Sequence, residues 1–247
     1  MTAGAGATAR GPHQGLPPAT AGPPPAVAAA ALVLVHGRGA TAESILALGA
    51  EVVGDDPGRR RVALVAPRAV GRSWYPRSFL APLADNEPGL SSALAVLGEL
   101  IAGLDADGVP PERVVLAGFS QGACLALEFA ARNPRRYGGV AGLTGGLIGP
   151  PGTPRQDLVA GPGSLAGTPV FLGAGDPDPH VPWPRVEETA EALRRLGAAV
   201  DLRRYPGLPH TVNAEEIAAV RALVDGALAA GMAAGGAEAA GLAGSDD

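Results

Sequence analysis

The sequence is poor in cysteine, lysine and aromatic residues, and each shortage narrows the classes of protein to which it can belong. One cysteine, Cys124, is present among 247 residues, so no disulfide can form within the chain. Small secreted domains that depend on disulfides are thereby excluded, and no feature requires an oxidising compartment. Cys124 lies in an apolar, helix-like run, where we expect it to pack as a small hydrophobic side chain.

Lysine is absent, and all 19 basic residues are arginines. The net charge is -5 and no basic stripe occurs, so nucleic acid is not expected as a partner. The N-terminal stretch has glycines and prolines instead of a continuous apolar run after Arg10, and it therefore does not resemble a signal peptide. We expect a cytoplasmic protein without a membrane span, and the composition leaves open whether it forms a homodimer.

The two ends of the chain differ in composition from its middle. Residues 1–27 are of low complexity at first and then rich in proline, which predicts a tail and an extended arm without regular elements. Residues 231–247 are dominated by alanine and glycine and lack core-forming side chains, which predicts a disordered tail. The remaining residues, 28–230, are long enough for one α/β domain with a substantial core.

Strand-like and helix-like segments alternate along this domain. Short runs of β-branched and other apolar residues predict strands at 31–36, 62–66, 114–118, 140–143, 170–173 and 200–205. Apolar residues at helical spacing predict helices at 44–53, 90–104, 124–131, 185–196 and 214–228. This order is typical of a mostly parallel, twisted sheet with helices on both faces. In such sheets, functional sites lie beyond the carboxyl ends of the strands.

The pentapeptide Gly118-Phe119-Ser120-Gln121-Gly122 follows one of these strands and precedes a helix. A G-x-S-x-G sequence in this context is typical of the nucleophile elbow of serine hydrolases, in which a sharp turn exposes the serine hydroxyl. The two glycines leave room for the chain segments that cross there. Ser120 is therefore the predicted nucleophile, and the less favoured alternative is a serine that only caps the helix.

A serine hydroxyl needs a base at neutral pH, and the sequence contains four histidines. His13 lies in the N-terminal arm, and His36 ends a strand at a glycine turn, which we expect it to hold in place. His180 follows a turn that contains two aspartates. His210 lies in a loop between the last strand and the last helix, from which an imidazole can reach the nucleophile, so it is the predicted base.

An aspartate must orient the imidazole, and two candidates, Asp176 and Asp178, share the turn after the strand at 170–173. Either one completes the chain order Ser, Asp, His that α/β-hydrolases use. Two backbone N–H groups are predicted to form the oxyanion hole. They are that of Arg38, in the glycine-rich turn after the first strand, and that of Gln121, at the start of the helix beyond the nucleophile. We expect the Arg38 guanidinium to be solvated.

The chain offers few residues that could line a substrate pocket. Four aromatic residues lie in loops at the catalytic edge, where they either bind an acyl or aryl group or anchor the loops: Trp74, Tyr75, Phe79 and Trp183. Arg72 and Arg77 are expected to be solvated, with attraction of an anionic substrate as the alternative. A loop at 149–167 lies between nucleophile and aspartate, but no helical lid is inserted there, so we expect an open cleft.

Several motifs together resemble the phospholipase/carboxylesterase family, which includes the acyl-protein thioesterases: HGRG at 36–39, SWYP at 73–76 with SFL at 78–80, GFSQGACLALEF at 118–129, DPD at 176–178 before VP at 181–182, and PGLPH at 206–210. The resemblance covers nearly the whole chain. It implies an α/β-hydrolase fold without a large lid domain, a cofactor or a metal.

In that family, the aspartate three residues before the Val-Pro pair orients the histidine, which assigns this role to Asp178 and a supporting role to Asp176. The family pattern likewise gives Ser120 as nucleophile and His210 as base. The loop at 74–79 and the arginine of the HGRG turn resemble the bacterial branch of the family more closely than the eukaryotic thioesterases.

These observations predict a serine carboxylesterase or thioesterase that hydrolyses short- to medium-chain or aryl esters through an acyl-enzyme intermediate. Its partner would be a small-molecule ester or thioester. No group of His, Asp or Glu has metal-ligand spacing, so no metal is expected. Two alternatives are kept: a catalytically silent ligand-binding protein with the same fold, and a hydrolase acting on aromatic ring-cleavage products.

Overall fold

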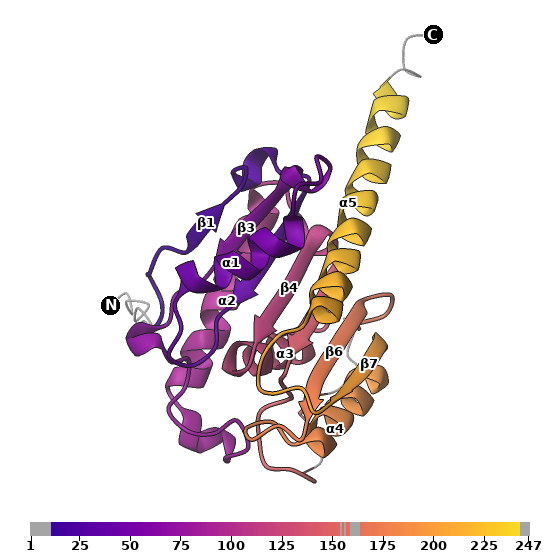
Figure 1. Cartoon of the computed structure of the whole chain (residues 1–247). Helices are drawn as coiled ribbons and strands as arrows, with labels where there is room; N and C mark the ends of the chain where they lie inside the picture. Colours follow the sequence, from indigo (N-terminus) through magenta and orange to yellow (C-terminus); the bar gives the residue numbers. More distant parts are fainter. Residues whose placement is uncertain (1–10, 154, 156, 159–163, 243–247) are drawn as a thin grey trace, which may run out of the picture.

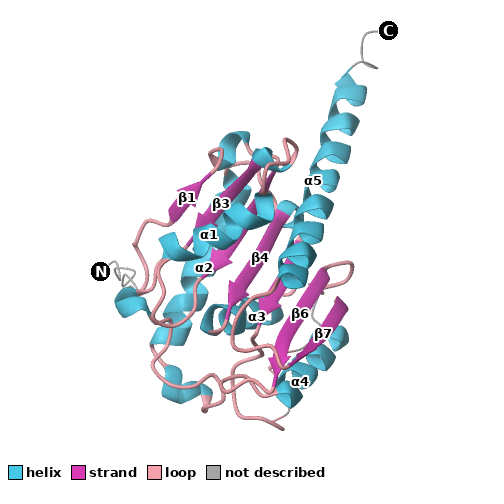
Figure 2. Cartoon of the chain, viewed as in Figure 1, coloured by secondary structure: helices cyan, strands magenta, loops and turns pink. Residues whose placement is uncertain are grey.

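The computed structural model describes residues 11–153, 155, 157–158 and 164–242, with side chains up to residue 231. Seven strands form one sheet in the order β1-β3-β2-β4-β5-β6-β7, in which β1 is antiparallel to β3 and every other neighbouring pair is parallel (Figure 2). The strands are β1 (Ala19–Ala21), β2 (Ala30–Val35), β3 (Val62–Ala66), β4 (Val114–Phe119), β5 (Gly139–Leu143), β6 (Pro169–Asp176) and β7 (Ala199–Pro206).

Helices cover both faces of this sheet (Figure 1). Helices α1 and α5 lie on one face, and α2, α3 and α4 lie on the other. The α-helices are α1 (Ala42–Val53), α2 (Gly89–Ala106), α3 (Gln121–Arg132), α4 (Trp183–Arg195) and α5 (Ala214–Leu242). Five short 3₁₀ helices occur in the described connections: Pro25–Val27, Arg59–Arg61, Val70–Arg72, Leu83–Asn86 and Pro111–Arg113. The predicted mostly parallel α/β-hydrolase fold is confirmed, and the described residues form no large lid.

The hydrophobic core has two layers because the side chains of a strand alternate between the faces of a sheet. In β2, Val33 and Val35 face the layer under α2, α3 and α4, whereas Leu32 and Leu34 face the layer under α1 and α5. All residues of this strand are buried. A strand buried on both faces reads as an unbroken apolar run, which is why the sequence predicted it without any alternation.

Helix α2 is long and apolar enough to cross a membrane by length and composition. In this structure it is a helix of the core instead. Leu90, Leu97 and Ile101 are buried in the layer beneath α2, α3 and α4. Its apolar character is therefore explained by packing against the sheet.

The structure corrects the predictions for both ends of the chain. The proline-rich arm includes the short strand β1, which pairs with the edge strand β3, so a regular element does form there. Helix α5 continues to Leu242, although a disordered tail is predicted from residue 231 (Figure 1). Alanine has the highest helix propensity, so an alanine-rich helix can extend past the last side chain that has a core to face. Residues 1–10 and 243–247 lie outside the described part of the chain.

The first turn of α5 fixes the end of the loop that carries His210. The Asn213 N–H donates to Glu216 Oε2 at 2.9 Å, and the Glu216 N–H donates to Asn213 Oδ1 at 2.9 Å. Glu216 is fully buried, and its other oxygen has no hydrogen-bond partner in the described structure. Burial raises the pKa of Glu216 to about 7, although the hydrogen bond from Asn213 acts in the opposite direction.

This pKa predicts how stability changes with pH. Glu216 ionises at a higher pH when folded than when unfolded, so the folded state loses stability as the pH rises from about 4.5 to about 7. Each pKa unit corresponds to about 1.4 kcal/mol. Glu216→Gln can keep the hydrogen bonds at the start of α5 but cannot ionise. The free energy of unfolding of this variant, relative to that of the wild type, should therefore rise as the pH increases across this window. Denaturant titrations at pH 4.5 and pH 7.5 measure the difference.

Glu215→Gln is the matched control, because Glu215 is exposed on the same helical turn. Its free energy of unfolding should follow that of the wild type at both pH values. Parallel behaviour of all three proteins would contradict the assignment of the pH effect to Glu216.

Candidate active site

Ser120 stands in the sharp turn between β4 and α3, with a positive φ of 56°. Two close approaches of the backbone fix this turn. A Cβ on Gly122 would overlap the Val35 carbonyl of β2, and a Cβ on Gly118 would overlap the carbonyl of Gly122. The Ser120 N–H also donates to the Leu143 carbonyl of β5 at 3.0 Å. The strand, turn and helix of a nucleophile elbow are therefore present, at the carboxyl edge of the sheet.

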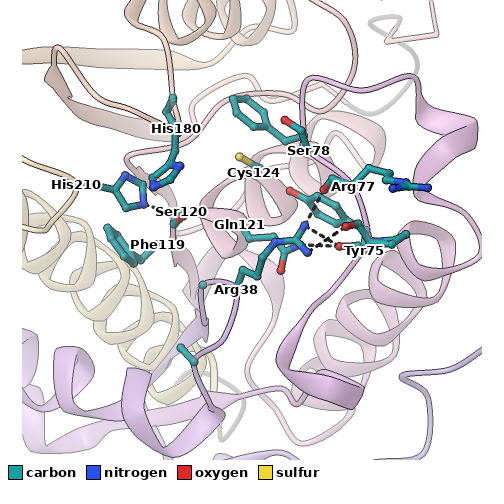
Figure 3. A pocket seen from close by; sticks show the side chains of 15 residues that line it. Arg38, Tyr75, Arg77, Ser78, Phe119, Ser120, Gln121, Cys124, His180 and His210 are labelled. Carbon is teal, nitrogen blue, oxygen red and sulfur yellow. Dashed lines mark hydrogen bonds between the residues drawn. The ribbon is translucent and has the colours of Figure 1, made fainter.

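The three predicted catalytic side chains form one hydrogen-bonded chain. His210 Nε2 lies 2.9 Å from Ser120 Oγ, and His210 Nδ1 lies 2.8 Å from Asp178 Oδ2. The residues come from the connections that follow β4, β6 and β7, so the carboxyl ends of three parallel strands of the sheet bring them together. Figure 3 shows His210 directed toward Ser120. With Nδ1 donating to the carboxylate, Nε2 is left as an acceptor for the serine hydroxyl.

The structure also distinguishes the two aspartates that the residues alone left open. Asp178 is the one that contacts His210, and its side chain is buried. Its Oδ1 accepts the backbone N–H groups two and three residues further along, each at 2.8 Å. Burial alone would raise the pKa of Asp178, but these hydrogen bonds and the imidazole outweigh it, so the pKa is lowered. Asp176 instead pairs with Arg204.

The other three histidines have different surroundings. His180 is exposed beside His210, edge-on to its ring with 4.8 Å between the centroids. His36 is buried, and its Nδ1 lies 2.9 Å from the carbonyl of the next residue, within the turn that it is expected to hold. His13 is buried as well, with Nε2 2.9 Å from the Trp74 carbonyl, so the arm is docked onto the domain. Burial lowers the pKa of both buried histidines.

The two predicted oxyanion donors lie on either side of the nucleophile. A Cβ on Gly37 would be 3.4 Å from Ser120 Cβ, so the turn after β2 lies against the serine. The backbone N–H of Arg38 makes no hydrogen bond within the described structure. The backbone N–H of Gln121 is the first of α3 and has no acceptor within the helix. Both N–H groups are therefore available to an anionic oxygen.

The side chains of Arg38 and Gln121 have a role that the sequence does not indicate. Arg38 Nη2 donates to the Tyr75 carbonyl at 2.9 Å, and its guanidinium also binds the carbonyls of the next two residues (Figure 3). Gln121 Nε2 donates to the same Tyr75 carbonyl at 2.9 Å, and its Oε1 accepts the Trp74 N–H at 3.1 Å. Arg38 is exposed, in line with the expectation of a solvated side chain, but its guanidinium also binds these backbone carbonyls.

A cleft of about 520 Å³ opens beside Ser120. Two of the predicted substrate-binding residues, Tyr75 and Phe79, line it. The prediction is wrong for Trp74 and Trp183, which lie in the core instead. The Trp74 indole N–H donates at 2.8 Å to a backbone carbonyl in the turn after β2, and Trp183 begins α4. A tryptophan can be buried when its indole N–H has a hydrogen-bond partner. The partner of Trp74 is distant in sequence, so the sequence does not reveal that this side chain is buried.

Glu128 of α3 anchors a segment of chain that lies against Phe79, one of the residues lining the cleft. Its carboxylate is fully buried, accepts the Ile148 N–H at 3.0 Å and pairs with the Arg155 guanidinium at 2.6 Å. The adjoining Gly149 N–H donates to the Phe79 carbonyl at 2.7 Å. If either partner of this buried ion pair were removed, the other charge would be left uncompensated and the folded state would lose stability. The sequence gives little indication of this network, whose only signal is a glutamate within an apolar helical run.

Of the two flanking arginines, Arg77 lines the cleft and Arg72 does not. Both are exposed. The loop predicted at 149–167 lies partly outside the described residues. No group of three or more His, Cys, Asp or Glu side chains that could hold a metal ion occurs in the described ranges.

Comparisons with known proteins agree on one family. The phospholipase/carboxylesterase family pattern matches residues 22–226. The chain is 36% identical to acyl-protein thioesterase 1 of Gibberella zeae over 117 residues, which are 47% of this chain and 49% of that protein. It is 30% identical to acyl-protein thioesterase 1 of Mycosarcoma maydis over 172 residues, which are 62% of this chain and 68% of that protein. The matches thus span about half to two thirds of the length of these thioesterases.

A solved structure gives a more complete match. The phospholipase/carboxylesterase from Dyadobacter fermentans is 44% identical, with a TM-score of 0.77. The comparison covers 84% of this chain and 95% of that protein. The likeness therefore extends over most of this chain and nearly all of that protein.

Proposed function

The chain belongs to the phospholipase/carboxylesterase family of α/β-hydrolases, and on that premise we propose that it is a serine esterase or thioesterase. Its substrates would be small-molecule esters or thioesters with a short- to medium-chain or aryl group. The observation that carries the proposal is the hydrogen-bond chain from Ser120 through His210 to Asp178, with distances of 2.9 and 2.8 Å. Nucleophile, base and orienting carboxylate have the order and contacts that acyl transfer requires.

In the first half-reaction, Ser120 Oγ attacks the carbonyl carbon while its proton passes to His210 Nε2. The carbonyl oxygen becomes an oxyanion, and the N–H groups of Arg38 and Gln121 would donate to it. The lowered pKa of Asp178 keeps this residue ionised at neutral pH, so it stabilises the imidazolium that forms. The imidazolium then gives its proton to the leaving group, at the oxygen of an alcohol or the sulfur of a thiol. Departure of this group yields the acyl-enzyme.

In the second half-reaction, water takes the place of the departed group. His210 accepts a proton from the water as its oxygen attacks the acyl carbonyl, and the same two N–H groups would hold the second oxyanion. The bond to Ser120 Oγ then breaks, and the proton returns from His210 to this oxygen. The products are the free acid and the regenerated hydroxyl.

The proposed nucleophile is tested by labelling with an aryl fluorophosphonate. Wild type should be labelled at one site, and Ser120→Ala should lose the label and at least about 10³-fold in kcat while it remains folded. Ser91→Ala is the matched control, since Ser91 is exposed on α2, away from the cleft. Ester hydrolysis by Ser120→Ala at a near wild-type rate would rule out the mechanism. A wild-type protein that is neither labelled nor active would favour a ligand-binding role.

The two aspartates offer a matched pair of variants. Asp178→Asn removes the charge that stabilises the imidazolium and should lower kcat about 10³-fold or more. Asp176→Asn alters only the pairing with Arg204 and should cost less than about tenfold. Steady-state kinetics with one p-nitrophenyl ester measures both. Equal or reversed losses would show that the imidazole depends on the other carboxylate.

The size of the cleft predicts the range of acyl groups. Each methylene that enters it should raise kcat/KM about fourfold, because burial of a CH₂ group contributes about 0.8 kcal/mol. Beyond medium-length chains, further methylenes should project into water and the gain should stop. Activity should also persist in EDTA, since no proposed step uses a metal. A series of p-nitrophenyl esters from acetate to palmitate, with and without EDTA, tests both points; a steady rise to palmitate or loss in EDTA would contradict them.

A further inference from the structure

The hydroxyl of Tyr75 is a buried hydrogen-bond donor to which the described residues offer no strong acceptor. The residue is 2% exposed, and its Oη has no hydrogen-bond partner within the described structure. Burial raises the pKa of this phenol, so it stays protonated and remains a donor at neutral pH. A buried polar group without a partner is destabilising, and such groups are rare in folded proteins. The hydroxyl therefore needs an explanation other than packing.

Tyr75 is one of the residues that line the cleft beside the nucleophile. Tyr75 and Cys124 both line the cleft, and Figure 3 shows the ring of Tyr75 directed toward the Cys124 thiol. Cys124 follows Ser120 by one turn of α3, a rise of about 5.4 Å along the helix axis. Burial raises the pKa of Cys124 to about 12, so it is a neutral thiol and at best a weak acceptor.

The ring cannot easily turn away from this position. The Tyr75 carbonyl accepts three hydrogen bonds, from Arg38, Gln121 and Ser73, each at 2.9 Å. The Arg38 guanidinium also lies 6.0 Å from the centre of the Tyr75 ring. The backbone and the ring are thus both fixed, which is the condition for a preorganised binding group.

The geometry separates the two ends of a bound substrate. Figure 3 shows His180, His210 and Phe119 on one side of Ser120, and Tyr75, Arg77 and Ser78 on the other. The leaving group must receive its proton from His210, so it occupies the histidine side. The acyl group then extends over α3 toward Tyr75.

We infer that the Tyr75 hydroxyl donates a hydrogen bond to an oxygen atom within the acyl group, so that the enzyme prefers oxo- or hydroxyacyl esters to alkyl esters of equal length. The inference rests on the proposed esterase function and specifies its substrate class. A site that hydrogen bonds a substrate group discriminates against an analogue that lacks the group, because the protein donor is then left unpaired. Cys124 and Phe79 supply the apolar surface around that single polar contact.

The experiment compares p-nitrophenyl 4-oxohexanoate and 5-oxohexanoate with p-nitrophenyl hexanoate, which share the leaving group and chain length. Wild type should hydrolyse at least one oxo ester with a kcat/KM about five- to tenfold above that of the hexanoate, the effect of one hydrogen bond. In Tyr75→Phe this ratio should fall to about one. The melting temperature of Tyr75→Phe should not fall, because the variant removes a donor that has no partner in the free protein.

Tyr137→Phe is the matched control. The Tyr137 hydroxyl is satisfied by the Asn133 carbonyl at 2.8 Å and lies outside the cleft, so its loss should lower the melting temperature and leave the oxo-to-alkyl ratio unchanged. A wild-type ratio near one for both oxo esters, or an equal ratio in wild type and Tyr75→Phe, would overturn the inference while leaving the esterase function intact. Failure of wild type to hydrolyse any of the three esters or to react with a fluorophosphonate would instead overturn the proposed function.

Discussion

The contact between the start of α3 and the end of β2 is the constraint on which the rest of the site depends. Only glycine at position 122 allows the helix to begin directly against the Val35 carbonyl. With the helix there, Ser120 is held at a positive φ, and its hydroxyl stands above the sheet. The same contact brings the first N–H of α3 next to the turn that carries the N–H of Arg38. One backbone approach thus supplies both the exposed nucleophile and the pair of donors beside it.

Two residues connect this backbone geometry to the wall of the cleft. Arg38 and Gln121 each place a main-chain N–H near Ser120 and a side chain on the Tyr75 carbonyl. A displacement of the loop that carries Tyr75 would therefore also displace the proposed oxyanion donors, and a displacement of these donors would move the loop. If these N–H groups form the proposed oxyanion hole, substitution of either side chain would change acyl binding and transition-state stabilisation together, and its effects on KM and kcat would not separate simply.

The sequence predicts those parts of the fold and site that have local signals. The strand at 62–66 is predicted with its observed bounds because a run buried on both faces is apolar throughout. The elbow is predicted because the steric requirement for its two glycines lies within a single stretch of five residues. The location of Trp74 could not be predicted, because its indole partner lies 38 positions away. The docking of His13 on the Trp74 carbonyl and the pairing of β1 with β3 depend likewise on segments that are distant in sequence and meet only in the fold.

The anchoring of the triad suggests where its catalytic power would come from. Ser120 is fixed by the Leu143 carbonyl, Asp178 by two N–H groups of its own turn, and the loop of His210 by the capped start of α5. Each residue is thus held before substrate binds. In the proposed mechanism, stabilisation of the transition state would thus depend on donors and charges that are already in position, in particular the two backbone N–H groups and the ionised Asp178.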